Sequence, residues 1–304
     1  PDHGAKPTDL MKCADVAMYV AKRNRAVVSV YNSKNNPYNQ KHLELTRDLR
    51  IAIKRKEIGL YFQPKIDLRS GTLIGAEALA RWSHPSHGEV SPAQFVPILE
   101  QTGLIAEFTL QVLDKAVCYC KQCERAGYEI SVAVNLSVHN LRDESLPDQV
   151  DDILMEHGLD SKRLTLEITE SAVMEDYMKS IEVLGELSDM GIELSIDDFG
   201  TGYSSLGYLK RMPVQQLKID RSFVCDMITD RDDAIIVRST VDLAHNLGLK
   251  TVAEGVETEE VLAVLGEMGC DQVQGYLISR PLPQEEFFLF LRNCEWIVPE
   301  ADAA

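Results

Sequence analysis

Short apolar runs of β-strand type alternate with longer segments of helical periodicity along most of this chain, and this alternation constrains the fold most strongly. It is typical of a parallel sheet with helices packed outside it. Eight strands favour closure into a barrel, and a barrel of about 250 residues fits the length. The predicted strands span residues 59–66, 73–79, 130–136, 164–168, 193–197, 215–219, 250–253 and 272–275. The predicted helices lie near residues 41–56, 104–127, 147–157, 173–190, 229–248 and 257–268.

One connection departs from this scheme. The first two predicted strands are joined only by DLRSGT, residues 67–72, which is too short for a helical crossover and suits a hairpin. These two strands are therefore expected to be antiparallel. The predicted fold class is α/β, a TIM-like (β/α)8 barrel with one antiparallel strand, in which strands 1 and 2 form a hairpin.

A polar side chain stands at the end of nearly every predicted strand. In a barrel, the carboxyl ends of the strands meet at one mouth, so these side chains are expected to gather in one site. Their carboxylate and amide oxygens are typical ligands of a hard divalent cation. The polar strand-end residues are Glu77 in GAEALARW, Asn135 in VAVNLS, Glu167 in LTLEITE, Asp197 and Asp198 in LSIDDFG, Lys218 in QLKID, Glu254 in TVAEGVE and Gln274 in QVQGY.

The charge balance restricts the partners. A formal net charge of -17 argues against binding a nucleic acid polymer, because that binding needs an excess of Lys and Arg to neutralise phosphates. A cluster of carboxylates can still bind a small phosphorylated ligand if divalent cations lie between them. The charge therefore favours metal-bridged phosphate chemistry.

The composition predicts a cytoplasmic domain without membrane contact. No apolar run approaches the roughly 18 to 20 residues of a membrane helix, and no secretory signal opens the chain. The 7 cysteines are an odd number without disulfide spacing, which favours a reducing compartment. A longer parent protein can still be attached to a membrane through another segment.

The domain organisation is predicted from shifts in composition. Residues 1–32 contain a short amphipathic helix followed by a strand, too little to bury a core alone. Residues 33–40 are rich in Asn with one Pro and are expected to be a linker. The barrel is assigned to residues 41–296, and residues 297–304 to an acidic tail.

Seven motifs occur in one order over residues 59–290: EALARW, VNLS, LEITE, IDDFGTGYSSL, LKID, AEGVE and QGY. Together they resemble the EAL-domain family of bacterial cyclic di-GMP phosphodiesterases, which is named for the triplet Glu77-Ala78-Leu79. The resemblance implies a TIM-like barrel with one reversed strand. It also implies hydrolysis of cyclic di-GMP to linear pGpG with Mg²⁺ or Mn²⁺, in bacterial second-messenger signalling.

The N-terminal segment resembles the last helix and strand of a GGDEF (diguanylate cyclase-type) domain. The glycine that usually follows the lysine at the position of Lys22 is missing, and so is the loop that names the GGDEF domain. This segment is therefore not expected to make cyclic di-GMP. The resemblance implies a parent protein with tandem GGDEF and EAL domains. The residues that carry it are Ala14-Asp15, Ala17-Met18-Tyr19 and Ala21-Lys22.

Two hard cations about 3.5–4 Å apart can clamp a phosphodiester and activate the attacking water, and both prefer oxygen ligands. Asp197 is expected to bridge the two cations, with Asp198 completing the second. Adjacent aspartates normally point to opposite faces of a strand, so the strand is expected to end there. The alternative is that this pair caps the following helix. The expected ligands of the first cation are Glu77, Asn135, Glu167 and Asp197.

Other polar residues are given supporting roles. Lys218 is expected to orient the attacking water or stabilise negative charge on the phosphate. Glu254 is either the general base or a metal ligand, and both readings remain open. Gln274 is expected to position water or Glu254. Glu257 either supports the site from behind or stabilises the first turn of a helix.

Substrate contacts are assigned to four residues. Arg81 can hold a phosphate through two parallel hydrogen bonds. Gln63 and Leu79 match family positions that touch the nucleotide. Tyr276 is expected either to stack on guanine or to be part of the core.

The loop DFGTGYSSLGYL, which begins at Asp198, is the predicted regulatory element, because its glycines permit unusual backbone angles next to metal ligands. The family resemblance implies that Glu170 anchors this loop and that the barrel forms a homodimer near it. Two alternatives to an active phosphodiesterase are a silent cyclic di-GMP receptor and an unrelated metal-dependent barrel enzyme. Receptors tend to lose acidic ligands or loop glycines, and this chain keeps both. An unrelated enzyme would need seven motifs to agree by accident.

Overall fold

A computed structural model describes residues 6–23, 28–32, 40–201 and 206–299 of the chain. The chain divides into two compact units, Pro1–Glu57 and Ile58–Ala304. In the first unit, α1 (Pro7–Arg23) and α2 (Gln40–Lys54) are helices. Residues 28–32 form no strand, so the strand predicted there is wrong over this range. The physical reason is that an extended segment needs a neighbouring strand for its backbone hydrogen bonds. The predicted linker lies, except for Gln40, outside the described residues.

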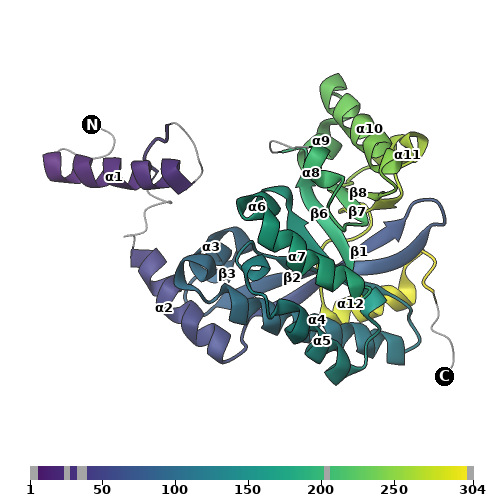
Figure 1. Cartoon of the computed structure of the whole chain (residues 1–304), viewed down its shortest axis with the longest axis horizontal. Helices are drawn as coiled ribbons and strands as arrows, with labels where there is room; N and C mark the ends of the chain where they lie inside the picture. The colour runs from purple at the N-terminus through teal and green to yellow at the C-terminus, as the bar shows by residue number, and fades with distance from the viewer. Residues whose placement is uncertain (1–5, 24–27, 33–39, 202–205, 300–304) are drawn as a thin grey trace. The chain divides into compact units, whose positions relative to one another are not determined.

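The second unit is a closed barrel of eight strands (Figure 1). Hydrogen bonding runs around it in the order β1-β9-β8-β7-β6-β5-β4-β2 and returns to β1. The predicted fold class is confirmed. The strands are β1 (Gly59–Asp67), β2 (Thr72–His84), β4 (Ser131–Leu136), β5 (Leu164–Thr169), β6 (Glu193–Phe199), β7 (Gln216–Ile219), β8 (Lys250–Ala253) and β9 (Gln272–Val273).

β1 is the reversed strand. It pairs antiparallel with β2 on one side and with β9 on the other, whereas the ladders from β2 through β4 to β9 are parallel. In the hairpin register Gln63 lies opposite Glu77. The turn is closed by Asp67, whose Oδ1 accepts hydrogen bonds from the backbone N–H and the hydroxyl of Ser70 at 2.8 and 2.7 Å. The DLRSGT segment therefore forms the hairpin that its length predicts, with Asp67 and Thr72 paired at the ends of the two strands.

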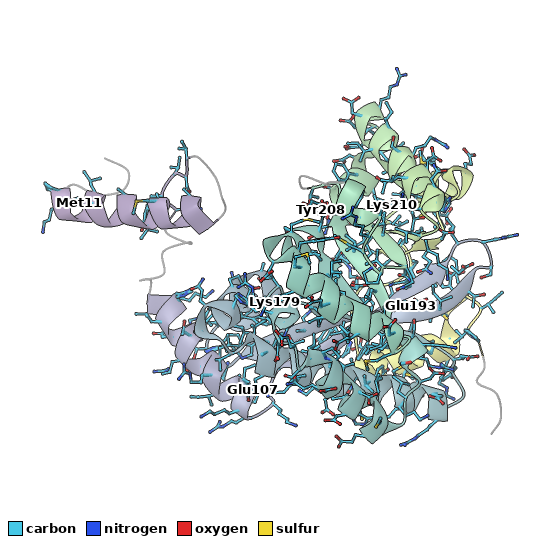
Figure 2. All side chains as sticks on the ribbon, in the orientation of Figure 1. Met11, Glu107, Lys179, Glu193, Tyr208 and Lys210 are labelled. Atoms are coloured by element: carbon cyan, nitrogen blue, oxygen red, sulfur yellow. The ribbon has the colours of Figure 1, made fainter. Side chains whose placement is uncertain are left out.

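Helices cover the outside of the sheet. α4 packs on β1, β2 and β4, α10 packs on β7 and β8, and α12 packs on β1. Side chains fill the space between these layers (Figure 2). Among the described residues, no helix combines the length and the apolarity needed to cross a membrane. The helices that match predicted segments are α4 (Ile105–Arg125), α5 (Leu146–His157), α7 (Tyr177–Asp189), α10 (Arg231–Asn246) and α11 (Glu259–Met268).

Several elements lie outside the predicted ranges. The helix predicted over residues 173–190 is interrupted at Asp176, whose φ of -143° and ψ of 72° are not helical. Its first part is a separate helix, α6 (Glu170–Glu175). The remaining strands and α-helices are β3 (Gly88–Val90), α3 (Pro92–Thr102), α8 (Leu206–Leu209), α9 (Arg221–Asp226), β10 (Leu282–Pro283) and α12 (Gln284–Asn293).

The predicted acidic tail begins with ordered contacts. Ile297 forms a β-bridge with Thr72, and its carbonyl accepts a hydrogen bond from Leu73 N at 2.7 Å. The carbonyl of Pro299 accepts a hydrogen bond from Glu129 N at 2.8 Å. The barrel therefore continues beyond the predicted boundary at residue 296, because these backbone groups complete the end of the barrel at the hairpin turn. Residues 300–304 lie outside the described residues.

Candidate functional site

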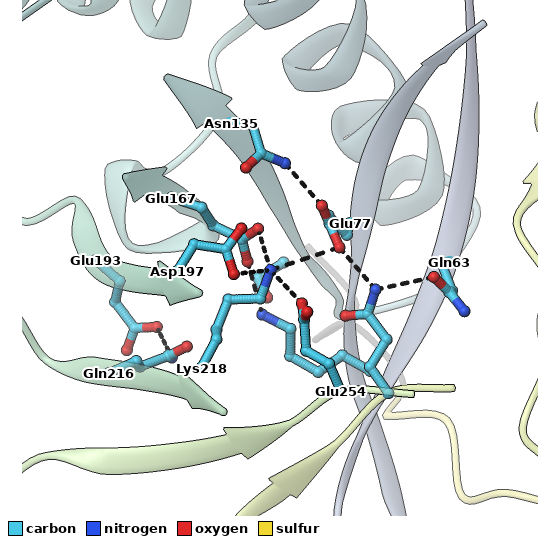
Figure 3. Close-up of polar contacts among 12 residues, drawn as sticks. Gln63, Glu77, Asn135, Glu167, Glu193, Asp197, Gln216, Lys218 and Glu254 are labelled. Carbon is cyan, nitrogen blue, oxygen red and sulfur yellow. Dashed lines mark hydrogen bonds and ion pairs between the residues drawn. The ribbon is translucent and has the colours of Figure 1, made fainter. Parts of the chain in front are cut away.

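The strand-end residues meet at one place (Figure 3). Lys218 is at its centre and is completely buried. Its Nζ lies 2.7 Å from Glu167 Oε2, 2.6 Å from Glu254 Oε1, 3.2 Å from Asp197 Oδ1 and 3.6 Å from Glu77 Oε2. Burial lowers the pKa of Lys218, but the surrounding carboxylates raise it well above its ordinary value. Four of the predicted carboxylates therefore lie around one buried lysine.

Glu77 is held by two amide side chains. Asn135 Nδ2 donates a hydrogen bond to Glu77 Oε1 at 2.7 Å, and Gln274 Nε2 donates one to Glu77 Oε2 at 2.7 Å. Gln274 Nε2 also reaches Gln63 Oε1 at 3.1 Å. Burial raises the pKa of Glu77, although Lys218 opposes this shift. Both oxygens of Glu77 thus have fixed donors, which orients the carboxylate toward the cluster.

Glu167 is paired with two lysines. Its Oε2 accepts from Lys218, and its Oε1 lies 3.4 Å from the Nζ of Lys65, a buried residue of β1. Burial raises the pKa of Glu167, but Lys218 and then Lys65 outweigh this and hold the pKa below its ordinary value. Glu167 is therefore a fully buried carboxylate kept ionised by two ammonium groups.

Asp197 and Asp198 both belong to the site because β6 changes its backbone conformation between them. The pairing of β6 with β7 shifts register between Ile196 and Phe199, and Asp198 has a φ of 54°, in the left-handed region. The strand was expected to end at this point, but it continues to Phe199. The left-handed residue breaks the alternation of faces instead.

The carboxylates of Asp197, Asp198 and Glu254 each offer an oxygen within 4.8 Å of the others. Burial raises the pKa of Glu254, Lys218 lowers it, and Asp197 and Glu77 raise it again, to about 8. Partial desolvation, followed by Asp197 and Asp220, raises the pKa of Asp198 to about 6. Such crowding of acidic groups is favourable once a divalent cation neutralises it, and the all-oxygen donor set suits Mg²⁺ or Mn²⁺.

Asp220 is a site residue that the sequence interpretation missed. It follows β7 directly and caps α9, where its side chain accepts a hydrogen bond from Ser222 N at 2.9 Å. Its carboxyl is close enough to Asp198 to help raise the pKa of that residue. The signal was present in LKID, an acid at a strand end two residues after Lys218.

Three of the four residues predicted to contact a substrate lie on the hairpin strands, Gln63 on β1 and Leu79 and Arg81 on β2. Glu77, Leu79 and Arg81 alternate along β2 and therefore share one face. The Arg81 guanidinium lies 5.3 Å from the centroid of the Tyr61 ring, which holds it against β1. Gln63 Nε2 donates to the carbonyl of Ser279 at 3.2 Å.

Tyr276 is 43% exposed, so the alternative that it belongs to the core is wrong. The guanidinium of Arg280 stacks over its ring at 4.2 Å from the centroid. Tyr276 lies two residues beyond Gln274 in the chain, and Arg280 lies six residues beyond it. An exposed ring of this kind is available to stack on a flat ligand.

The two remaining predicted residues lie at the periphery. Glu257 precedes the N-cap of α11, which is Thr258, and pairs with Arg221 at 3.9 Å. Glu170 is buried at the start of α6. Its predicted role as a loop anchor stays a prediction, since residues 202–205 of that loop lie outside the described part of the chain.

Residues 46–281 match the family described as EAL domain. The chain is 45% identical over 288 residues to the bifunctional diguanylate cyclase/cyclic di-GMP phosphodiesterase MucR of Pseudomonas aeruginosa, covering 94% of this chain and 42% of MucR. It is 40% identical over 296 residues to the cyclic di-GMP phosphodiesterase NbdA of the same organism, covering 96% of this chain and 38% of NbdA. The chain thus spans less than half the length of these relatives.

A solved structure of the PaMucR phosphodiesterase in complex with c-di-GMP superimposes with a TM-score of 0.77 at 46% identity. The match covers 80% of this chain and 99% of that one. The family match, the sequence identity to these relatives and the similarity of the folds all point to the same family. The chain therefore belongs to the EAL domain family.

Proposed function

We propose that this chain is a metal-dependent phosphodiesterase that hydrolyses cyclic di-GMP to linear pGpG. The observation that carries the proposal is the convergence of Asp197, Asp198 and Glu254 within 4.8 Å, beside the buried ammonium of Lys218. The relatives MucR and NbdA, whose names include this activity, support the substrate. The complex of PaMucR with c-di-GMP supports the ligand class.

The donor set fits two divalent cations, Mg²⁺ or Mn²⁺. When bound, the cations would supply Lewis acidity and neutralise negative charge at the scissile phosphate. A buried amide oxygen, Gln274 Oε1, has no hydrogen-bond partner among the described residues and offers a further acceptor near the cluster. The residues that would hold the cations are Glu77, Asn135, Glu167, Asp197 and Asp198, with Asp220 added on structural grounds.

The protein's own groups have separable tasks. Lys218 brings positive charge to the centre of the carboxylates and would stabilise negative charge on the reacting phosphate. Glu254 is the most solvent-accessible partner of Lys218, with 19% of its side chain exposed. It can accept a proton from the attacking water or ligate a cation. Gln274 holds Glu77 in place through its amide.

Substrate binding is assigned to the open side of the cluster. Arg81 would bind a phosphate, Gln63 and Leu79 would contact the nucleotide, and Tyr276 would stack on a guanine base. Tyr276 is the aromatic residue of the four, and its ring is exposed. The Arg280 guanidinium already occupies one face of this ring. Its other face is therefore the one assigned to the base.

The wider setting is also part of the proposal. We place the domain in the cytoplasm, as a homodimer formed near the DFGTG loop, with Glu170 anchoring that loop and Glu257 supporting the site. The helix α1 is assigned to the end of a GGDEF domain that precedes residues 33–40. The full-length MucR is named as bifunctional, which agrees with such a tandem arrangement.

The decisive experiment is to incubate the metal-stripped chain with cyclic di-GMP and Mg²⁺ or Mn²⁺, with EDTA as control, and to separate the products by chromatography. Metal-dependent pGpG is the expected result. Binding of cyclic di-GMP without any product would favour the silent receptor, and no binding would contradict both readings.

A pair of variants tests the assignment of the ligands. Glu77→Gln keeps the size of the side chain but removes the charge, so turnover should fall by at least about 100-fold. Glu144→Gln is the matched control, because Glu144 pairs with Lys179 on the surface with 80% of its side chain exposed. Substantial metal-dependent turnover by folded Glu77→Gln would contradict the assigned role of Glu77.

A further inference from the structure

The layer of interior side chains directly below the site is polar. Side chains alternate between the faces of a strand, so residues two positions from Glu167, Lys218 or Gln274 point into the barrel as these do. Interior layers of such barrels are usually filled by branched apolar side chains. The polar members of this layer, each at most 4% exposed, are Lys65, Thr165, Ser195, Gln216 and Gln272.

Lys65 connects this layer to the site above it. Its Nζ lies 3.4 Å from Glu167 Oε1, while Glu167 Oε2 is 2.7 Å from Lys218 Nζ. The side chains of Lys65 and Glu167 are both buried. Each oxygen of Glu167 therefore faces its own ammonium, and this fixes the plane of the carboxylate.

A buried lysine at this position is not explained by stability alone. Replacing a buried ion pair with well-packed apolar residues is often neutral or stabilising, because both charges lose their hydration. The apolar alternative suits the strand, since the neighbouring residue Ile66 is completely buried. A lysine inside the barrel is therefore better accounted for by what it does to Glu167.

Other members of this layer also carry buried oxygen atoms. Ser195 Oγ, Gln216 Oε1 and Gln272 Oε1 are buried and have no hydrogen-bond partner among the described residues. Buried polar atoms of this kind are normally satisfied, often through ordered water. Gln216 is anchored by its other end, where Nε2 donates to Glu193 Oε2 at 2.8 Å (Figure 3). The layer is thus polar beyond Lys65, and its apolar replacement is not what the sequence uses here.

We propose that Lys65 is a positioning residue for the metal ligand Glu167. It holds Oε1 from below, which leaves Oε2 directed at the carboxylate cluster around Lys218. This inference rests on the proposed function, in which Glu167 binds a divalent cation. It adds a residue from the antiparallel strand β1 to a site otherwise built from the ends of the parallel strands.

The test compares Mn²⁺ binding by metal-stripped variants, measured by titration calorimetry, with their thermal unfolding in EDTA. Lys65→Met removes the charge at nearly constant volume and should weaken Mn²⁺ binding about 10- to 100-fold, as expected for a partner that orients a ligand. Lys65→Arg keeps the charge and should recover part of the affinity. Ser195→Ala changes the same layer at the position that pairs with Glu167 in the β5–β6 register, but it leaves both ion pairs of Glu167 in place and should keep the wild-type dissociation constant.

Each outcome decides whether Lys65 positions Glu167 or only contributes to the stability of the barrel. Unchanged or tighter Mn²⁺ binding by Lys65→Met, whatever its thermal stability, would overturn the positioning role. If Lys65→Met does not fold, Lys65→Gln takes its place, and it should bind Mn²⁺ more weakly than Lys65→Arg. A wild-type chain that binds no Mn²⁺ would overturn the proposed function and this inference with it, whereas wild-type binding isolates the test of Lys65.

Discussion

The Nζ atom of Lys218 lies 2.6 Å from Glu254 Oε1 and 2.7 Å from Glu167 Oε2, so one buried ammonium joins two carboxylates from opposite sides of the β7 strand. Asp197 and Glu77 lie within 4.0 Å of the same atom. Lys218 is thus the internal counter-ion of the acidic cluster. Without it, the carboxylates would depend on bound cations for neutralisation.

We expect Lys218→Met to make folding depend on divalent cations. Breaking a buried ion pair by removing one partner costs about 3–5 kcal/mol. The midpoint of thermal unfolding in EDTA should therefore fall, and Mn²⁺ should raise it more in the variant than in the wild type. Lys179→Met is the control, since Lys179 pairs with Glu144 at the surface, where an ion pair contributes little. Equal stabilisation of both variants by Mn²⁺ would contradict the counter-ion role.

Gly275→Ala should destabilise the barrel next to Gln274. A Cβ atom at Gly275 would lie 2.1 Å from the carbonyl oxygen and 2.3 Å from the amide nitrogen of Val256, so the backbone must move. Overpacking of this kind costs about 1–3 kcal/mol or more. Urea denaturation should show this loss, together with weaker Mn²⁺ binding because Gln274 holds Glu77.

Gly185→Ala in α7 is the matched control for that change. A Cβ atom at Gly185 meets nothing within 4 Å, and Ala is favoured over Gly in a helix interior by roughly 0.5–1 kcal/mol. We therefore expect Gly185→Ala to be slightly stabilising. If both glycine variants had the same stability, the close approach of Gly275 to Val256 would have no energetic consequence.

Asp271→Asn should lower stability in a pH-dependent way. Partial burial raises the pKa of Asp271, but hydrogen bonds from His245 and Thr251 outweigh it and hold the pKa below the ordinary value of 3.8. A carboxyl with a depressed pKa stabilises the fold above its unfolded pKa and loses this contribution as the pH falls through its folded pKa. The stability difference between wild type and Asp271→Asn should therefore be full near neutral pH and shrink below about pH 4. A difference that is constant with pH would contradict the ionised state of Asp271.

Thiol labelling should separate the cysteines by burial. Burial raises the pKa of Cys120 and Cys123 to about 12 and that of Cys270 to about 11, and all three side chains are buried. Cys225 is exposed. Iodoacetamide at about pH 8.5 should modify Cys225 first, because the thiolate is the reacting form and must be accessible. Peptide mass spectrometry measures the order, and early labelling of Cys270 would contradict the packing around β8.

The barrel and most of the residues at its mouth were predictable because both depend on local sequence signals. These signals are the alternation of strands with helices and the polar residues at the strand ends. Glu167 and Lys218 stand out as charged residues inside apolar strands, and a strand-end rule brings them together. Lys65 escaped that rule because it lies within β1, where the sequence does not say which face looks inward. Asp220 escaped it because an acid before a short helix also reads as an N-cap, and here it is one.

The conformation of Asp198 could not be predicted either. Two adjacent aspartates reach the same site through a left-handed residue within β6, and non-glycine residues adopt that conformation seldom. The hydrogen bond from Thr201 Oγ1 to the carbonyl of Asp198 at 2.9 Å closes the local turn, whereas the register shift of β6 against β7 forms only in the folded barrel. The sequence predicts which residues meet, whereas tertiary contacts decide how they point.

The reversed direction of β1 also determines where this domain can accept foreign sequence. The turn between β1 and β2 lies at the end of the barrel remote from the ligand-bearing strand ends, and Arg69 and Ser70 at its tip are exposed. A reporter domain inserted between them would be anchored by both strands of one hairpin. One of these strands bears Glu77 and the other bears Gln63 and Lys65. The hairpin is therefore a natural place to build a biosensor in which strain on an inserted domain is transmitted along two strands to the ligand-bearing mouth.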